Sequence, residues 1–495
     1  MRIATNVSAI VSNNALQKSQ DRLTKSIARL SSGYKINSSS DDAAGYAISE
    51  KMRLQLRGLN QADNNAADGV SVLHTAEGAM EEIQSMLARM KELSVQAANG
   101  TNSVDERSAI QSEIDSLNSE IDRISSNTEF NSQTLISGNL SRRVYSNYEG
   151  VNQIEVSDNF VAGNYGITIT QDARQAIVVG NGAVTMSDTA TVTKEQAGTI
   201  SMNGYGIEIS EGDTLAGIMG KLVDGADKIG GRVFAITAGA TNDTKVNGTD
   251  YAGYEPQTSY AGNNIVFMTK ESGSSKTMNI TCSNAELANM LGIATAATNS
   301  GMYAEGSDVQ AEFTLDNDGK RVGFADSAVI STSGTRVTVK DVNNRTFVTD
   351  VPSNVAGTQF SDTVKADDKS TATSTQTAKV TQEVTDVGTM SVHVGANENQ
   401  VILIDIPAVT SYTLGTENLN VMTSVTASEA IDTIDTAVAY ANRVRSQMGA
   451  YENRFEHTTN NLGTASENLT SAISTMTDTD MAEEMVNYSK NSILA

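Results

Sequence analysis

Apolar residues recur every three or four positions near both ends of the chain, and this spacing limits the possible folds more than any other feature. Steps of three and four alternate over residues 73–90 and again over residues 110–124, and steps of three, four or seven continue over residues 431–476. Such spacing lines up the apolar side chains as one seam along a helix, and the seam needs other helices to cover it. We therefore expect long helices from the two chain ends to pack together.

The composition between these helical ends indicates a different kind of structure. Asn99 and Gly100 interrupt the first repeat, so the first two helices should fold back on each other there. Between about residues 140 and 420 the chain is rich in Thr, Ser, Gly, Asn and Val, with alternating runs such as YGITIT at 165 and TRVTVKDV at 335, which are typical of strands. Within this region, residues 215–222 should form one short amphipathic helix. The predicted fold class is α+β, a long antiparallel α-helical coiled-coil bundle formed by both chain ends with a β-rich outer insert in the middle.

Several kinds of chemistry lack the residues that they need. Acidic residues outnumber basic ones by 59 to 35, which gives a formal net charge of −24 and argues against nucleic-acid binding. Cys282 is the only cysteine, and it should be a small buried side chain in a strand. His74, His393 and His457 are too far apart in sequence for a local metal motif, and no phosphate-loop, dinucleotide-binding or catalytic-serine signature occurs. We expect no enzymatic activity, cofactor, metal, signal peptide or membrane span.

The first 30 residues carry apolar side chains at helical spacing among polar ones, and the sequence offers them no obvious partner. These positions are Ile3, Val7, Ile10, Leu16, Leu23, Ile27 and Leu30. A helix of this polarity is marginal in water, so we expect the tail to be disordered until it packs against neighbouring molecules, and the same holds for the short tail after Thr477. After the N-terminal tail, Asp41 and Asp42 indicate a turn and a helix N-terminus. We predict a connector between subunits there, with a simple helix cap as the alternative.

Long stretches of the sequence resemble bacterial flagellins. Residues 3–49 (beginning IATNVSAIVSNN) resemble the flagellin N-terminus, and the segment MGAYENRFEHTTNNLGTASENLT from residue 448 resembles the C-terminal domain. Residues 388–406 resemble the strand segment that leads into that domain, and residues 213–230 are similar to an insert motif shared with hook-associated proteins. The resemblance implies a secreted, extracellular protein that self-assembles into the bacterial flagellar filament for motility. It also implies an export chaperone, the flagellar secretion apparatus and hook-associated proteins as partners.

The resemblance further implies how the chain divides. We expect terminal tail helices in the inner filament core, a helical core domain with a β-hairpin segment, and a β-rich variable outer domain with two subdomains. The expected ranges are 1–40 and 478–495 for the tails, 41–175 and 388–477 for the core, and 176–387 for the outer domain, split into about 176–305 and 306–387. Flagellins continue beyond a segment like SKNSIL with another helix that pairs with the N-terminal helix. The chain is therefore expected either to be truncated or to differ there.

A receptor surface is also implied by the resemblance. Flagellins that share the segment ARMKELSVQ are bound by the vertebrate Toll-like receptor for flagellin, and the contact residues correspond here to Arg89, Leu93, Gln96 and Glu113. The first three should share one helix face, with Leu93 exposed beside the arginine. The alternative is that this face contacts only the next subunit of a filament.

Two other functions are weighed against the filament subunit. A hook–filament junction or cap-type protein of the same axial family would share the helical ends but would not polymerise alone. An enzyme-bearing flagellin would need a metal or triad motif in residues 176–387, and the sequence contains none there.

Overall fold

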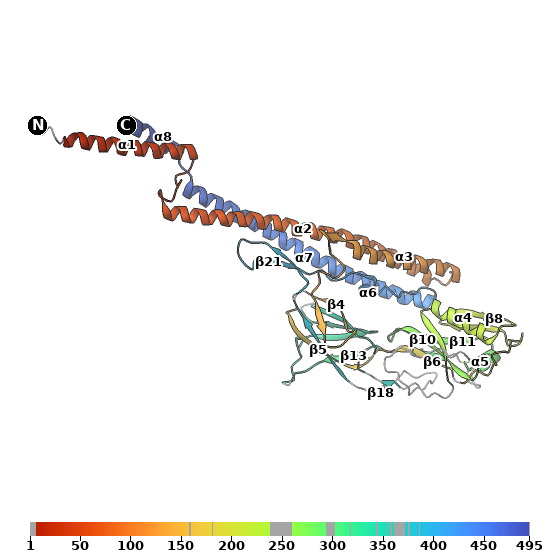
Figure 1. Cartoon of the computed structure of the whole chain (residues 1–495). Coiled ribbons are helices and arrows are strands. Elements are labelled where there is room, and N and C mark those ends of the chain that lie inside the picture. Colours follow the sequence, from red (N-terminus) through yellow and green to blue (C-terminus); the bar gives the residue numbers. More distant parts are fainter. Residues whose placement is uncertain are drawn as a thin grey trace. The chain divides into compact units, whose positions relative to one another are not determined.

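The computed structural model of the chain (Figure 1) describes residues 6–494, apart from 158–159, 181, 238–259, 294–301, 317, 343–344, 354, 357–358, 361–371, 375–376 and 386. The helices in these ranges are α1 Val7–Ser32, α2 Ala43–Ala98, α3 Val104–Asn127, α4 Leu215–Lys228, α5 Ala285–Met290, α6 Ser411–Leu414, α7 Ser424–Thr477 and α8 Met481–Leu494. The strands are β1 Glu129–Phe130, β2 Gln133–Thr134, β3 Val144–Ser146, β4 Asn152–Val156, β5 Gly163–Gln171, β6 Gln175–Val179, β7 Gly198–Met202, β8 Tyr205–Ile209, β9 Gly231–Thr237, β10 Asn263–Ser272, β11 Thr277–Cys282, β12 Met302–Glu305, β13 Gln310–Phe313, β14 Val329–Ser333, β15 Arg336–Lys340, β16 Thr346–Asp350, β17 Gln359–Phe360, β18 Ala372–Ser374, β19 Ala378–Val384, β20 Met390–His393 and β21 Val401–Ile404.

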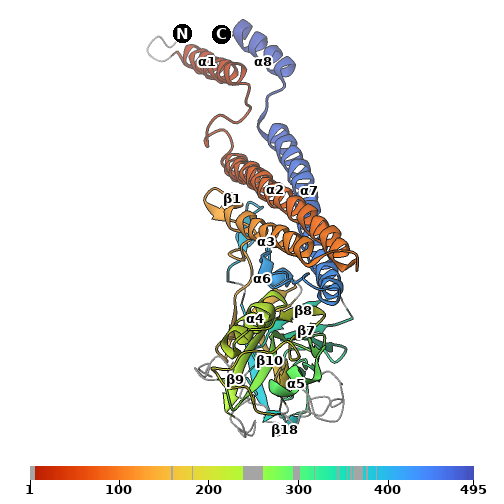
Figure 2. The same cartoon turned by 90° about the vertical axis from the view of Figure 1, so that its right-hand side faces the viewer.

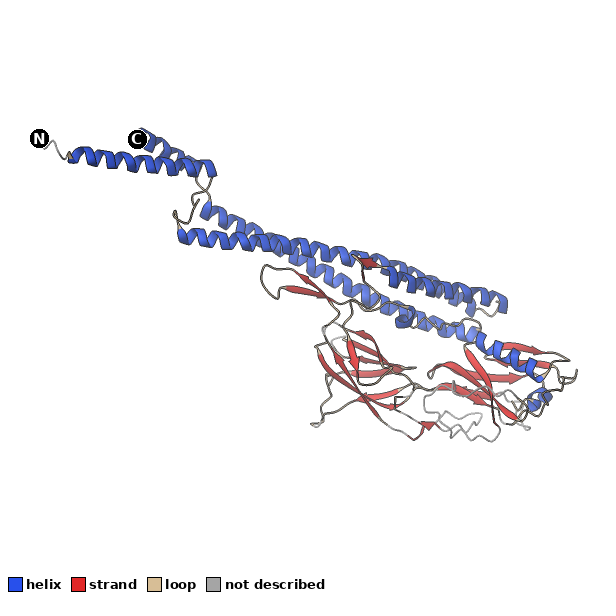
Figure 3. Ribbon diagram, viewed as in Figure 1, coloured by secondary structure: helices blue, strands red, loops and turns tan. Residues whose placement is uncertain are grey.

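The predicted fold class is confirmed, because the long helices come from the two ends of the chain and most strands from its middle (Figure 3). The three heptad runs fall in α2, α3 and α7, and the short amphipathic run falls in α4. The chain forms two compact units: one holds residues 1–74, 391–404 and 449–495, and the other holds 75–390 and 405–448.

In the first unit, close contacts at small residues bring three segments together. The ring of Phe455 on α7 is fully buried against Gly69 of α2, where an added Cβ would lie 2.9 Å from the ring. The hairpin of β20 and β21 approaches α2 at Gly58, where an added Cβ would lie 3.0 Å from the Cβ of Ala396. Glycine at these two positions therefore allows the aromatic ring and the hairpin to reach the helix.

In the second unit, a capped turn joins α2 to α3. Ser103 and Glu106 form a capping box in which the Glu106 carboxylate accepts a hydrogen bond of 2.7 Å from the Ser103 amide. The Arg107 side chain donates to the carbonyls of Ala97 and Asn99, so it closes the turn from the other side. The predicted turn is confirmed. The seam behind it is fully buried at Met80, Ile83, Leu87, Met90, Ile114, Ile121 and Ile434.

A row of polar side chains on α3 holds α6 and the loop that follows it before α7. Asp122 accepts hydrogen bonds from the amide and hydroxyl of Ser411, and buried Asn118 donates to the carbonyl of Thr416. Further along α3, Gln111 donates to the carbonyl of Leu419 at 2.8 Å. Buried backbone amides and carbonyls that have no partner in a helix or sheet need hydrogen bonds from elsewhere. The side chains of α3 provide these hydrogen bonds.

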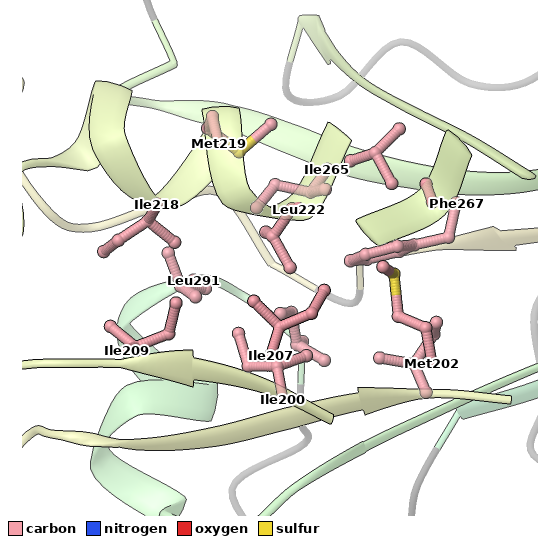
Figure 4. Close-up of a cluster of buried hydrophobic side chains, with 14 of the residues drawn as sticks. Ile200, Met202, Ile207, Ile209, Ile218, Met219, Leu222, Ile265, Phe267 and Leu291 are labelled. Carbon is pink, nitrogen blue, oxygen red and sulfur yellow. The ribbon is translucent and has the colours of Figure 1, made fainter. Parts of the chain in front are cut away.

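The middle of the chain contains two β modules with separate cores. The first combines the sheets β6-β10-β9 and β12-β11-β7-β8 with α4 and α5. Figure 4 shows Ile218 and Leu222 of α4 facing the sheet residues Ile200 and Ile207. Gly225 of α4 leaves room for Ile207, because an added Cβ there would lie 2.3 Å from the Ile207 Cδ1.

The second module combines the sheets β13-β5-β19-β3 and β14-β15-β16-β4. Its core contains edge-to-face rings, with centroids 5.1 Å apart for Tyr165 and Phe324 and 5.4 Å apart for Phe324 and Phe347. Strands β3, β4 and β5 precede the first module in sequence, whereas their partners β19, β16 and β13 follow it. The first module is therefore inserted within the second. The sequence analysis placed residues 144–171 with the helical core.

Cys282 ends strand β11 and is half-buried. Burial raises the pKa of its thiol above the usual value, and the thiol donates a hydrogen bond of 3.2 Å to the carbonyl of Asn284. The side chain therefore favours the unreactive protonated form.

Candidate assembly surface

Helices α1 and α8 lie side by side and antiparallel in the first unit (Figures 1 and 2). The side chains that they bury most fully are polar. The buried residues of α1 are Ser19 and Ser26, and the buried residue of α8 is Glu484. Ser19 donates a hydrogen bond of 3.2 Å to the carbonyl of Asn491, and an Arg29 guanidinium nitrogen lies 3.7 Å from a Glu484 carboxylate oxygen.

The apolar side chains of the same two helices face outward. On α1, Val7 is 67% exposed, Ile10 is 55% exposed and Val11 is 61% exposed. The large exposed apolar residues of α8 are Met481, Met485, Val486, Ile493 and Leu494. Apolar surface removed from water is stabilising by ~25 cal/mol per Å², so these faces favour contact with another apolar surface.

The predicted interface residues of the N-terminal tail lie mostly on this outward face. Val7, Ile10, Leu16 and Ile27 are exposed. Leu23 and Leu30 are half-buried, and Ile3 lies outside the described residues. The sequence analysis missed Val11, although it lies four residues after Val7 on the same helix face.

The C-terminal segment SKNSIL is itself part of the helix that packs on α1. The sequence analysis expected that partner to follow this segment. Instead α8 spans Met481–Leu494 and contains it. Asp480 accepts hydrogen bonds from the amides of Ala482 and Glu483, so it caps the N-terminus of α8.

Two backbone hydrogen bonds join the segment that follows α1 to the segment that precedes α8. The amide of Lys35 donates to the carbonyl of Thr477 at 2.6 Å, and the amide of Thr479 donates to the carbonyl of Gly33 at 2.9 Å. Gly33 ends α1 with a φ of 76°, in the left-handed region that glycine adopts without strain. We call this pair of segments, residues 33–35 and 477–479, the neck.

Asp41 and Asp42 lie between the neck and α2. The Asp41 carboxylate accepts hydrogen bonds from the amides of Asn37 and Ser38, and Asp42 accepts from the amides of Ala44 and Gly45. Desolvation raises the pKa of Asp41, but the hydrogen bonds from Asn37 and Ser38 outweigh it, so the pKa lies below its usual value. The predicted turn and helix N-terminus are confirmed. Their role as a connector between subunits stays a prediction.

The predicted receptor residues Arg89 and Glu113 are joined in the second unit. The Arg89 guanidinium lies 2.9 Å from the Glu113 carboxylate and 3.2 Å from that of Glu92. The hydrogen bond to Glu113, with a further one to Glu92, raises the pKa of Arg89. Gln96, one helical turn beyond Glu92, is exposed. Arg89, Glu92 and Gln96 therefore present one polar face of α2 to solvent.

The expectation that Leu93 is exposed is wrong. Its side chain is 2% exposed and belongs to the core, because it follows Met90 by three residues and shares the buried seam. The large exposed apolar residue nearby is Val95, at 53%.

No helix in the described ranges combines the length and the apolarity needed to cross a lipid bilayer.

Comparisons with known proteins agree with this geometry at both ends of the chain. Residues 3–141 match the bacterial flagellin N-terminal helical region, and residues 431–495 match the bacterial flagellin C-terminal helical region. These two ranges contain α1, α2, α3 and α8 and most of α7.

Curated relatives extend the similarity to nearly the whole chain. A flagellin of Clostridium tyrobutyricum is 32% identical over 98% of this chain and 94% of its own length. A flagellin of Salmonella rubislaw is 31% identical over 99% of this chain and 94% of its own length. The solved structure of FliC from Burkholderia pseudomallei aligns with 14% identity and a TM-score of 0.23, over 78% of this chain and 99% of that one. On the strength of the two sequence relatives, the chain belongs to the bacterial flagellins, and it is a structural subunit of the extracellular flagellar filament.

Proposed function

We propose that copies of this chain polymerise through the outward apolar faces of α1 and α8. The observation that carries this proposal is the inverted burial of α1, in which Ser19 and Ser26 are buried while Val7, Ile10 and Val11 are exposed. A helix that served only its own chain would bury its apolar residues. Contact with a second copy removes the exposed stripe from water and offsets the entropy lost when the tails become ordered.

Deletion of residues 1–30 tests this role. We expect a folded monomer whose core melts as in the wild type and which does not extend filament seeds. A matched deletion control is a chain that lacks residues 239–258, which belong to the expected outer domain. This chain should still polymerise. Normal filaments from the chain without residues 1–30 would contradict the proposal.

The division into tails, core and outer domain is proposed for the filament as well. Residues 1–40 and 478–495 would line its inner core, residues 41–175 and 388–477 its wall, and residues 176–387 its outer surface. Support comes from the Thr-, Ser- and Asn-rich sequence of the middle of the chain and from the exposed apolar faces of the tails. The role is structural rather than enzymatic. The hook–filament junction or cap-type alternative is not favoured, because the relatives that align over nearly the full chain are flagellins.

The exposed apolar residues of α8 fit a second partner before assembly. An export chaperone would cover Met481, Met485 and Val486 while the chain is held for the secretion apparatus. Hook-associated proteins would contact the same tails at the base of the filament. Binding of purified chaperone to the chain should be lost when residues 478–495 are deleted, whereas deletion of residues 1–30 should leave it intact.

The face of α2 that carries Arg89 is proposed as the contact for the vertebrate Toll-like receptor for flagellin, with Gln96 and Glu113 alongside. Its support is the exposed ion pair of Arg89 with Glu113. Leu93 would act from beneath, by holding the helix against its seam. Because loss of an interface anchor costs ~2 kcal/mol or more, monomer affinity for the receptor ectodomain should fall at least about tenfold in Arg89→Ala.

The matched control for this experiment is Arg57→Ala, at an exposed arginine of the same helix. Both variants should keep the circular dichroism spectrum of the wild type. Unchanged affinity in a folded Arg89→Ala protein would refute the receptor assignment, and the face would then be left to contacts between subunits.

A further inference from the structure

We propose that the ion pair between Arg29 and Glu484 fixes the rotation of α8 about its own axis, and so keeps the apolar side chains of the tails outward for assembly. This inference rests on the proposed assembly surface. It assigns a positioning role to two residues that do not themselves belong to the outward face.

The neck aligns the two segments along the chain direction but leaves the rotation of the helices beyond it open. Its two hydrogen bonds involve only backbone atoms of residues 33–35 and 477–479. Arg29 and Glu484 lie within the first two turns beyond the neck, one on each helix. They are therefore placed where a side-chain contact sets how each helix leaves the neck.

The seam between α1 and α8 is only partly apolar, because Leu23 and Leu30, at helical spacing with two buried serines, are half-buried. Ser19 and Ser26 are its buried residues on α1, whereas Met485 and Val486 of α8 are 50% and 68% exposed. Neighbouring residues on an α-helix are about 100° apart around its axis. A rotation of α8 by that angle would bring Met485 toward α1 and turn Glu484 toward water. Hydrophobic burial and carboxylate solvation would both favour that turn in an isolated chain.

The Arg29 guanidinium opposes this rotation. Glu484 is 8% exposed, and Arg29 is the cation that the described residues place within 4 Å of its carboxylate. The Glu484 side chain is nearly buried whereas that of Arg29 is 33% exposed, so loss of Arg29 would leave the buried carboxylate without a compensating charge. Buried polar pairs in helical assemblies are best known for selecting one arrangement among several of similar stability.

Adjacent glutamates provide a matched test. Glu484→Gln removes the buried charge, whereas Glu483→Gln removes an exposed one from the same turn. In seeded polymerisation of the full chain, we expect Glu484→Gln to raise the critical concentration by about tenfold, equivalent to ~1.4 kcal/mol, and Glu483→Gln by less than about twofold. The charge-exchanged double variant Arg29→Glu, Glu484→Arg should return to within about threefold of the wild type, while each single reversal should not.

A second readout follows the rotation itself. In a Cys282→Ala background, a cysteine placed by Met485→Cys should react with a maleimide more slowly when Glu484→Gln is added, because position 485 turns toward α1. An unchanged labelling rate together with normal polymerisation of Glu484→Gln would overturn the inference. Normal polymerisation of the chain without residues 1–30 would instead overturn the assembly surface on which it rests.

Discussion

Helices α1 and α4 carry apolar residues at the same helical spacing, yet they place them in opposite environments. Leu215, Ile218 and Leu222 of α4 are fully buried under the first β module, whereas Ile10 of α1 is 55% exposed. The sheet that covers α4 comes from the same chain. The contrast shows that spacing specifies a helix with an apolar face but not what covers that face, and we propose that a second copy of the chain covers the face of α1.

The largest effect on stability should come from the buried member of this pair. Leu222→Ala deletes a fully buried side chain, so we expect the free energy of unfolding of the first β module to fall by about 2–5 kcal/mol. Chemical denaturation measures this loss, and seeded polymerisation below the melting temperature should be unaffected. Val223→Ala, at a 36% exposed position of the same helix, is the control and should cost far less. A polymerisation defect in folded Leu222→Ala would break the comparison.

The reverse pattern is expected at the exposed member. Ile10→Ser should leave the melting temperature of the core unchanged and raise the critical concentration for polymerisation about tenfold to hundredfold, because an isoleucine side chain contributes ~1.5–3 kcal/mol on burial. Gln17→Ser, at an exposed polar position of α1, is the control. If both substitutions weaken filaments equally, the apolar character of the face is not what drives assembly.

Asp41 and Asp42 lie in the segment between α1, with its exposed apolar face, and the start of α2. Replacing both by alanine removes caps worth about 0.5–2 kcal/mol each, and we expect filament stability to fall by more than monomer stability does. Melting of the monomer and thermal dissociation of the filament measure the two effects. Equal losses would favour the simple helix cap over a connector between subunits.

The smallest effect concerns Glu429 of α7, which lies 3.8 Å from Lys276 of the first β module. Burial raises the pKa of Glu429, Lys276 opposes this, and Glu271 adds to it. A raised carboxyl pKa means that the folded state prefers the protonated form, so this group's favourable contribution is present at low pH and is lost as the pH rises through the folded pKa. Melting temperatures from pH 4 to pH 8 should therefore decline less in Glu429→Gln than in the wild type. An identical pH dependence in both proteins would show that Glu429 does not contribute.

The sequence predicted elements whose partners lie nearby or repeat regularly. The heptad runs located α3 and α7, and Asn99 with Gly100 located the turn before α3. It did not predict that β5 pairs with β19, because a pairing across about two hundred residues depends on the whole module rather than on local pattern. The error at Leu93 has a local cause. Leu93 lies four residues after exposed Arg89 but also three residues after buried Met90, and it packs with the buried seam.

The buried polar residues of the tails could not be predicted from the sequence pattern either. Periodicity identifies apolar positions, but Ser19, Ser26 and Glu484 are ordinary surface residues by type, and only the pairing of α1 with α8 shows that they are buried. Nothing in residue type alone distinguishes Glu484 from Glu483. The rotation of a helix becomes visible only when its partner is in place.

Amide hydrogen exchange of α1 and α4, measured in the monomer and again in the polymer, tests the central claim most directly. The amides of α4 should be equally protected in both states, because the cover of α4 belongs to its own chain. The amides of α1 should exchange rapidly in the monomer and gain at least about tenfold protection in the polymer, because their cover arrives with the neighbouring subunits. An α1 that is as protected in the monomer as α4, with no further gain on polymerisation, would contradict the account.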